Sequence, residues 1–384
     1  MDFSFNEDQL VIQENVRRFA EDKLLPEYQN NDNKHTFDPE MLKEMGELGL
    51  IGCELSERYG GLELGYVTAG LITAEISRAD FNVAYVPLLA GLNGGIIQQF
   101  ARPHLAEKWI TKIIKGESLV AVALTEPGAG SDAANLQLKA ERKGDVFVLD
   151  GEKTSISAAA QADIAIVFAR TGSQEEKARG VSAFLVPLDH PNITRTHFDD
   201  IGESIVGRGS IFFDGVEVPA ENMLGEEGLG FIQVMQGFDY SRALIGLQCL
   251  AAAEKSVEET WEYVREREAF GQKISKFEGV SFPLAEAETF LEAAKLLCYK
   301  TLWLRDQGKP HTAEAAMCKW WAPKVSFDII HQCLLAHGHG GYSKDFPIQQ
   351  RLRDVLGLQI GDGTAQIQKI IIAREKIGRD GVPY

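Results

Sequence analysis

The sequence predicts an α+β fold in which one block of strands lies between two blocks of helices. Three observations support this: the length of 384 residues, a change from helical to strand-like hydrophobic spacing near residue 119, and the return of helical spacing near residue 226. At about 100–200 residues per domain, the length fits two or three domains. We therefore expect an N-terminal helical domain (1–118), a middle β-barrel or sandwich domain (119–225) and a C-terminal four-helix bundle (226–384).

The N-terminal block opens directly with an amphipathic helix, because Ile12, Val16 and Phe19 recur on one helical face. This start has neither the charged region nor the apolar core of a signal peptide. The most apolar window, VPLLAGLNGGII, is too short and too rich in glycine to span a bilayer. We expect no membrane association and a cytoplasmic location.

The other two blocks differ in the length and spacing of their apolar runs. The middle block contains five short β-rich runs separated by turn residues: LVAVALT, DVFVLDG, DIAIVFAR, GVSAFLVPL and SIFFDGVEVP. The C-terminal block contains long alanine- and glutamate-rich helical segments such as QCLAAAEKSVEETWEYVRERE, LAEAETFLEAAKLLCYKTLWLR and TAEAAMCKWWAPKVSFDIIHQCLLA. Segments of this kind are typical of helix bundles.

Charge and cysteine content exclude several classes of function. The net charge of −17 is spread along the chain, which argues against binding to nucleic acid or to an anionic membrane. An anionic ligand would have to be held by helix N-termini and individual arginines. The five cysteines are scattered, odd in number and without a C-x-x-C pair, so we expect free thiols in a reducing compartment.

Two glycine-containing segments carry the candidate chemistry. LTEPGAGSD, from Leu124 to Asp132, follows a strand and offers glycines and hydroxyls where backbone can approach a flat ring. It lacks the G-x-G-x-x-G pattern and the helix-opening turn of a Rossmann site. In GLQIGDGTAQIQ, Asp362 stands between two glycines, and Thr364 is the expected N-cap of the next helix. An Asp-Gly pair is usually a solvated loop, and no neighbour along the chain looks built to neutralise this acid.

Three histidines, His331, His337 and His339, lie close together in the sequence. No acidic or thiol ligand repeats beside them at the spacing that a metal site needs. HGHGGY reads instead as a tight backbone turn. We therefore predict no metal site.

Four segments in order, LTEPGAGSD, REREAFGQKI, GYSKDFPIQQRLRD and RDVLGLQIGDGTAQIQKIIIARE, resemble the acyl-CoA dehydrogenase family, and the α–β–α order matches it over the whole chain. The resemblance implies the acyl-CoA dehydrogenase fold, FAD as cofactor and an acyl-CoA substrate. It further implies an electron-transfer flavoprotein as electron acceptor and a homotetramer built as a dimer of dimers.

The resemblance also assigns a role to Asp362, which occupies the position of the catalytic Glu in the family's Y-E-G-T stretch. This residue would remove the alpha proton of the thioester, while hydride passes from the beta carbon to flavin N5. Because that C–H bond is a weak acid, the base must lie dry and close, with a raised pKa. Its backbone N–H and a flavin ribose hydroxyl would stabilise the thioester oxygen. A second family branch carries its base at the position of Ser241, so that alternative base is absent.

Further roles follow from the matched positions. The expected FAD contacts are Leu124, Thr125, Gly130, Ser131, Ser155, Ser157, Gly338, Thr364 and Gln366, with Arg267, Phe270 and Gly271 reaching the FAD of a neighbouring subunit. The expected substrate contacts are Ser131, Asp239, Arg242, Gly361 and Gly363. From its surroundings alone Arg267 reads as a solvated helix charge. Arg242 has apolar neighbours, so it needs an anion or Asp239 as partner.

Departures from the family pattern point to the substrate. Gly361 replaces an aromatic residue, Ser155 replaces the usual Trp, and Asp362 is one methylene shorter than Glu. Since a misplacement of about 1 Å can lower the rate on the order of 100-fold, a shorter base requires a closer or bulkier alpha carbon. This suggests an alicyclic or alpha-branched acyl group, such as cyclohexane-1-carboxyl-CoA oxidised to cyclohex-1-ene-1-carboxyl-CoA.

Three alternatives remain open at this stage: a linear short- or medium-chain acyl-CoA dehydrogenase, an enoyl-CoA reductase of the same fold, and a catalytically idle flavoprotein subunit. The family's Q-x-x-G-G-x-G-Y reads LAHGHGGY here, so an amide is lost and His339 replaces a glycine, which keeps the idle subunit as an alternative. The retained acid, both FAD motifs and the D-x-x-R pair argue against it.

Overall fold

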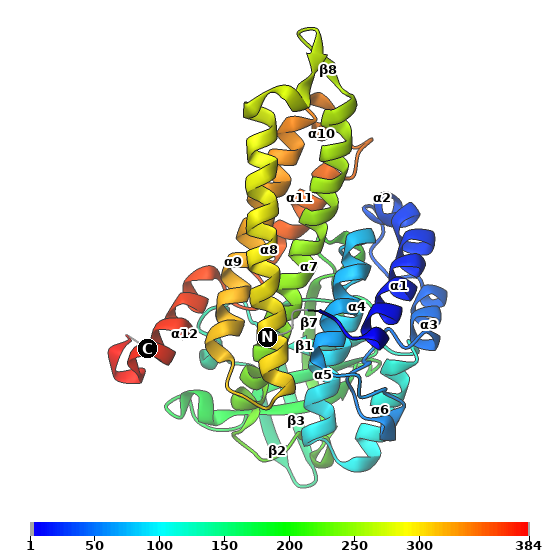
Figure 1. Cartoon of the computed structure of the whole chain (residues 1–384). Coiled ribbons are helices and arrows are strands. Elements are labelled where there is room, and N and C mark those ends of the chain that lie inside the picture. Colours follow the sequence, from blue (N-terminus) through cyan, green and yellow to red (C-terminus); the bar gives the residue numbers. More distant parts are fainter. Residues whose placement is uncertain (1–3, 383–384) are drawn as a thin grey trace.

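The computed structural model describes residues 4–382 and shows helices, then a sheet, then helices along the chain (Figure 1). The N-terminal helices are α1 (Glu7–Phe19), α2 (Tyr28–Asn31), α3 (Pro39–Glu47), α4 (Tyr66–Ala79), α5 (Tyr85–Phe100) and α6 (Pro103–Ile114). Asn6 begins α1 with a capping box, in which Asn6 and Gln9 each accept a hydrogen bond from the other's backbone N–H. Val16 and Phe19 are buried as their spacing predicts, on the side of α1 that packs against α4.

The middle block is one sheet with strand order β1-β4-β2-β3-β7-β6, and β5 pairs with β4. Its strands are β1 (Val120–Ala123), β2 (Lys139–Lys143), β3 (Val146–Ile156), β4 (Ile164–Arg170), β5 (Val181–Pro187), β6 (Ile193–Arg195) and β7 (Gly209–Pro219). Every residue of β4 is buried, which explains its continuous apolar run. The sequence analysis missed β2 and β6, because KAERK and ITR are polar and become strands only by pairing with β3 and β7.

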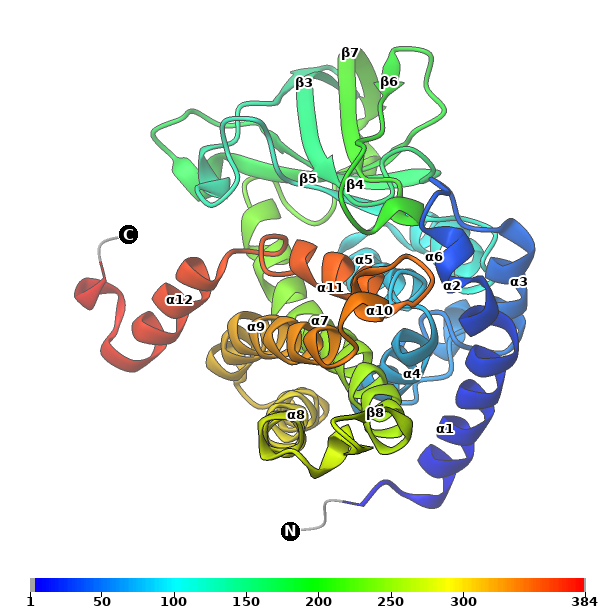
Figure 2. The same cartoon turned by 90° about the horizontal axis from the view of Figure 1, so that it is seen from above.

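The C-terminal block is a bundle around α7 (Gly230–Glu266), which packs on α4, α5, α8 and α9. The remaining helices are α8 (Glu278–Asp306), α9 (Thr312–Ala336), α10 (His339–Tyr342), α11 (Ile348–Gly357) and α12 (Ala365–Ile377). A small hairpin of β8 (Glu268–Ala269) and β9 (Gln272–Lys273) stands at the tip of the bundle in Figure 1. α12 packs on α9 and projects from the body in Figure 2.

Asp354 of α11 fastens the three blocks together. Its carboxylate accepts hydrogen bonds from the Tyr28 hydroxyl (2.7 Å), the Asn82 amide (3.1 Å) and the backbone N–H of Glu203 (2.7 Å). Burial raises the pKa of Asp354 to about 7. Since α11 leads into the loop that carries Asp362, this contact sets the position of that loop relative to the sheet.

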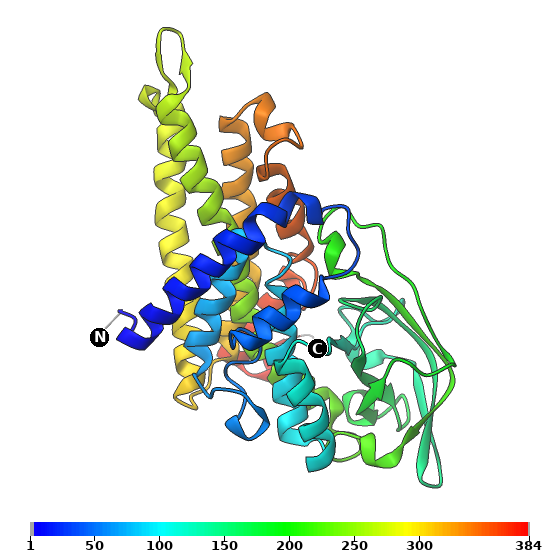
Figure 3. The same cartoon turned by 90° about the vertical axis from the view of Figure 1, so that its right-hand side faces the viewer.

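The expected fold class is confirmed, with the sheet on one side and the long helices on the other (Figure 3). The exact domain limits stay a prediction. Among the helices of residues 4–382, none combines the length and the apolarity that crossing a bilayer requires.

Candidate active site

Asp362 lies on the loop between α11 and α12, where the backbone takes an uncommon conformation. Its φ is 55° and that of Gly363 is 90°, both in the left-handed region. Glycine occupies that region freely and Asp tolerates it better than most residues, which explains the Asp-Gly pair. Thr364 is the N-cap residue of α12, as predicted, but its side chain makes no capping hydrogen bond.

Two side chains from distant helices hold Asp362. The Ser241 hydroxyl on α7 donates a hydrogen bond to Asp362 Oδ2 (3.0 Å). Gln368 Nε2 on α12 donates to the backbone oxygens of Asp362 (3.0 Å) and Gly363 (3.1 Å). One carboxylate oxygen is therefore engaged, and Oδ1 is the atom left to accept a proton. Ser241 occupies the family's alternative base position and contacts the acid instead of replacing it.

A buried lysine lies behind the same loop. Lys319 of α9 is 1% exposed, and its Nζ donates to the backbone oxygens of Leu358 (2.7 Å) and Gly363 (3.4 Å). Burial lowers the pKa of Lys319 to about 8, and the negative charge of Asp362 acts in the opposite direction. The acid that looks isolated in the sequence thus has a cation close to it in the fold.

Arg242, one residue beyond Ser241 on α7, forms an ion pair with Asp239. Their Nη1 and Oδ1 atoms are 3.1 Å apart, and Thr312 donates to the other oxygen of Asp239 (2.6 Å). The expectation that Arg242 is partnered is confirmed. Arg242 is buried, which lowers its pKa, and its Nε has no partner in the described part of the chain. That N–H is available for a polar group of a ligand.

The LTEPGAGSD loop is fastened to β3 by a buried ion pair. Lys153 Nζ donates to Glu126 Oε1 (2.8 Å) and to the Leu124 backbone oxygen (2.9 Å). The Thr154 backbone N–H donates to the Thr125 oxygen (2.9 Å). These bonds place the predicted FAD contacts Leu124 and Thr125 beside the end of β3 that carries Ser155 and leads to Ser157. A Cβ added at Gly128 or Gly130 would meet no atom within 4 Å, so the loop offers open backbone for a flat ring.

Arg267, Phe270 and Gly338 lie elsewhere in the same chain. Phe270 is 95% exposed in the turn of the β8–β9 hairpin, at the opposite end of the bundle from the sheet (Figure 1). Arg267 lies at the base of this hairpin, and Gly338 joins α9 to α10 near the same end. The fold does not bring these residues to Asp362.

The histidine segment has a structural role at His337. Its ring stacks on Tyr263 at 4.2 Å between centroids, and its Nδ1 lies 2.9 Å from the Cys333 backbone oxygen. Within residues 4–382, no group of three or more His, Cys, Asp or Glu side chains is arranged to hold a metal ion. The predicted tight turn is a single helical turn, α10, entered through Gly338 with φ of 59°.

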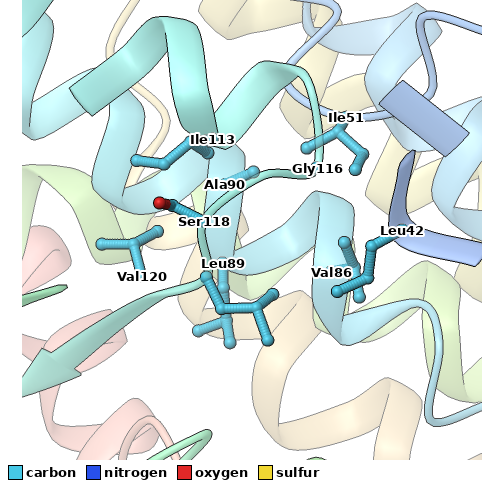
Figure 4. Close-up of a pocket in the computed structure, with 10 residues that line it drawn as sticks. Leu42, Ile51, Val86, Leu89, Ala90, Ile113, Gly116, Ser118 and Val120 are labelled. Carbon is cyan, nitrogen blue, oxygen red and sulfur yellow. The ribbon is translucent and has the colours of Figure 1, made fainter. Parts of the chain in front are cut away.

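Two of the hollows among residues 4–382 differ in size and position. The first, between α3, α5, α6 and β1, has apolar walls such as Leu42, Val86 and Ile113 (Figure 4). Its free volume of about 10 Å³ holds at most one water, so it is a packing void. The second, about 280 Å³ and open, is lined by Trp320, Lys324, Phe327, Asp328, Leu356, Gln359, Ala365 and Lys369. Ala365 and Lys369 place this hollow at the start of α12.

Comparisons with known proteins agree with this geometry. Three family descriptions match: acyl-CoA dehydrogenase N-terminal domain (residues 6–117), middle domain (121–216) and C-terminal domain (228–377). The mitochondrial short-chain specific acyl-CoA dehydrogenase of Mus musculus is 34% identical over 365 residues, covering 94% of this chain and 88% of that protein. Butyryl-CoA dehydrogenase from Megasphaera elsdenii has a TM-score of 0.94 at 33% identity, covering 98% of this chain and all of that one.

A further solved structure, described as an electron transferring flavoprotein of Acidaminococcus fermentans, matches with a TM-score of 0.95 at 33% identity, covering 98% of this chain and 100% of that one. The fold and the two loops define a flavin-dependent oxidoreductase, with FAD as its cofactor. The chain belongs to the acyl-CoA dehydrogenase family.

The sequence analysis missed Lys319 and Gln368 as supports of the base. A signal for Lys319 was present, because a lysine between Cys318 and Trp320 on a helix is buried only when it has a partner. What that partner is could not be predicted, since the hydrogen bond to Leu358 spans 39 residues.

Proposed function

We propose that this acyl-CoA dehydrogenase oxidises an alicyclic or alpha-branched acyl-CoA, such as cyclohexane-1-carboxyl-CoA, with Asp362 as the base. The single observation that carries the substrate class is the open space at Gly361. A Cβ built there meets only the backbone oxygen of Gly357, at 3.8 Å. Gly361 has no side chain, and Ser241 holds one oxygen of the neighbouring Asp362 carboxylate. Together they leave room for a bulky group at the alpha carbon of the substrate.

The proposed chemistry at Asp362 uses groups whose positions are known. Oδ2 is held by Ser241, so Oδ1 takes the alpha proton. The backbone N–H of Asp362 makes no hydrogen bond within residues 4–382, so it can donate to the thioester oxygen as charge develops there. The Nε of Arg242 can bind a carbonyl of the CoA arm. When bound, FAD accepts the hydride from the beta carbon.

The proposed residues for FAD are those of the two loops and of α12. Thr125, Gly130 and Ser131 would lie against the flavin with Ser155 and Ser157, while Thr364 and Gln366 would contact it from the start of α12. The open backbone at Gly130 supports this assignment. Gly361, Gly363, Ser131, Asp239 and Arg242 would contact the substrate.

The proposal includes a homotetramer and an electron-transfer flavoprotein as acceptor. The distance of Phe270 and Arg267 from their own Asp362 loop supports an assembly in which they serve another copy (Figure 1). The match to a structure described as an electron transferring flavoprotein supports the acceptor. A cytoplasmic location is proposed with them, supported by five free, buried cysteines.

A linear short-chain acyl-CoA is the second candidate substrate. It is favoured by the matched relatives, which are named for short-chain and butyryl substrates. Anaerobic titration of the yellow protein with butyryl-CoA, octanoyl-CoA and cyclohexane-1-carboxyl-CoA, followed by flavin absorbance, separates the candidates. Bleaching chiefly by the cyclic thioester supports our proposal, and bleaching chiefly by a linear one refutes it. No bleaching by any of the three would favour a reductase or an idle subunit.

Two variants sharpen this test. Gly361→Tyr refills the open space, so we expect it to lose the cyclic substrate while keeping butyryl-CoA. Asp362→Asn should bind FAD and lose bleaching by every thioester. If Asp362→Asn kept full activity, Asp362 would not be the base.

A further inference from the structure

Lys319 is a buried cation without a carboxylate bonded to it. Its hydrogen bonds go to the backbone oxygens of Leu358 and Gly363, at 2.7 and 3.4 Å. A buried lysine normally has a hydrogen-bonded acid as its counter-charge, because burying an isolated charge is costly. The acid whose charge acts most strongly on Lys319 is Asp362. Within residues 4–382, the ammonium of Lys319 therefore bonds only to the loop that carries Asp362.

The two carbonyls that Lys319 binds lie on either side of Asp362 in the sequence. Leu358 follows the end of α11 and Gly363 comes directly after Asp362, so a single ammonium ties both ends of the loop to α9. The loop also contains two residues with positive φ, a conformation that external contacts must hold. Lys319 provides such contacts from outside the loop.

The helices α7, α5 and α12 bring other charged and titratable groups near Asp362. From α7 come Arg242, already paired with Asp239, and the neutral hydroxyl of Ser241. From α5 comes Tyr85, whose pKa is raised by burial so that it stays neutral. From α12 comes Arg374, close enough to act on the charge of Arg242. Lys319 is thus a cation near Asp362 that has no acid bonded to it.

We propose that Lys319 is a positioning residue for Asp362, which fixes both ends of the base-carrying loop through its hydrogen bonds to the backbone oxygens of Leu358 and Gly363. This inference rests on the proposed role of Asp362 as base. Lys319 contacts no reacting atom and acts through Asp362. Its hydrogen bonds hold the loop, and with it the Asp362 carboxylate, in place.

The test compares Lys319→Met and Lys319→Gln with Lys319→Arg in the FAD-loaded enzyme. Both the Met and the Gln variant should lose about tenfold or more in kcat while KM and flavin content stay close to those of the wild type, since a misplacement of about 1 Å can lower the rate on the order of 100-fold. Lys319→Arg keeps N–H donors for the two backbone oxygens, so it should recover part of the lost kcat.

Lys300→Met is the matched control, because Lys300 is an exposed lysine on α8 paired with Glu314. It should leave kcat and KM unchanged. A purely structural lysine would lower the melting temperature without lowering kcat in the folded, FAD-loaded enzyme. If kcat is unchanged in Lys319→Gln, or in Lys319→Met where that variant folds, while Asp362→Asn is inactive, the inference about Lys319 is wrong and the base assignment stands. Full activity in Asp362→Asn would show that Asp362 is not the base, and the inference about Lys319 would then lose its premise.

Discussion

Replacing Lys153 by Met removes the ammonium that fastens the LTEPGAGSD loop to β3. Lys153 is fully buried, and its Nζ donates to Glu126 (2.8 Å) and to the Leu124 backbone oxygen (2.9 Å). Methionine matches the length of the side chain but donates no hydrogen bond. The carboxylate of Glu126, itself 6% exposed, would then keep only the backbone N–H groups of Gln137 and Leu138.

The expected effect is large, because breaking a buried ion pair leaves one charge without its counter-ion. Such changes cost about 3–5 kcal/mol of unfolding free energy. For a chain of this length, that corresponds to a fall in melting temperature of roughly 4–6 °C. Since Leu124 and Thr125 begin the proposed FAD loop, we also expect weaker FAD retention in Lys153→Met.

Thermal melting followed by circular dichroism, together with release of flavin fluorescence, measures both effects. The matched control is Lys153→Met with Glu126→Gln, which removes the orphaned charge and should recover at least half of the lost stability. A melting temperature of Lys153→Met within about 1 °C of the wild type, which is roughly 1 kcal/mol, would refute this reasoning. So would a double variant less stable than the single one.

Three further outcomes are expected. Ser241→Ala removes the hydrogen bond to Asp362 Oδ2, so kcat should fall about tenfold with FAD retained, which steady-state kinetics and flavin absorbance would check. Gly357→Ala places a Cβ 2.7 Å from the Glu203 carboxyl atoms and should cost about 1–3 kcal/mol in denaturant unfolding; an unaltered midpoint would contradict the packing described. Burial raises the pKa of Asp80 from 3.8 to about 7, so its stabilising contribution is present below pH 4 and is lost as pH rises through 7. Between pH 5 and 7 the wild type should therefore lose up to about 2 kcal/mol more than Asp80→Asn, as measured by unfolding at each pH.

The order of helices and strands was predictable because hydrophobic spacing is a local property of the chain. The alternation that marks β7 and the helical spacing of α9 are present within each segment, and the fold confirms both. The strand β2 was not predictable, since KAERK has one buried residue and takes its conformation from pairing with β3. Its register depends on a neighbour that the sequence alone does not identify.

The candidate site likewise has one part that the sequence predicted and another that only the fold revealed. The sequence alone singled out Asp362, the glycines beside it and the loop from Leu124 to Asp132, because each is a short contiguous motif. Only the tertiary structure brought Ser241, 121 residues away, and Lys319 to the loop of Asp362. The physical reason is that a carboxylate's environment is set by distance in space, and hydrogen bonds and charges act across helices that are far apart in the chain.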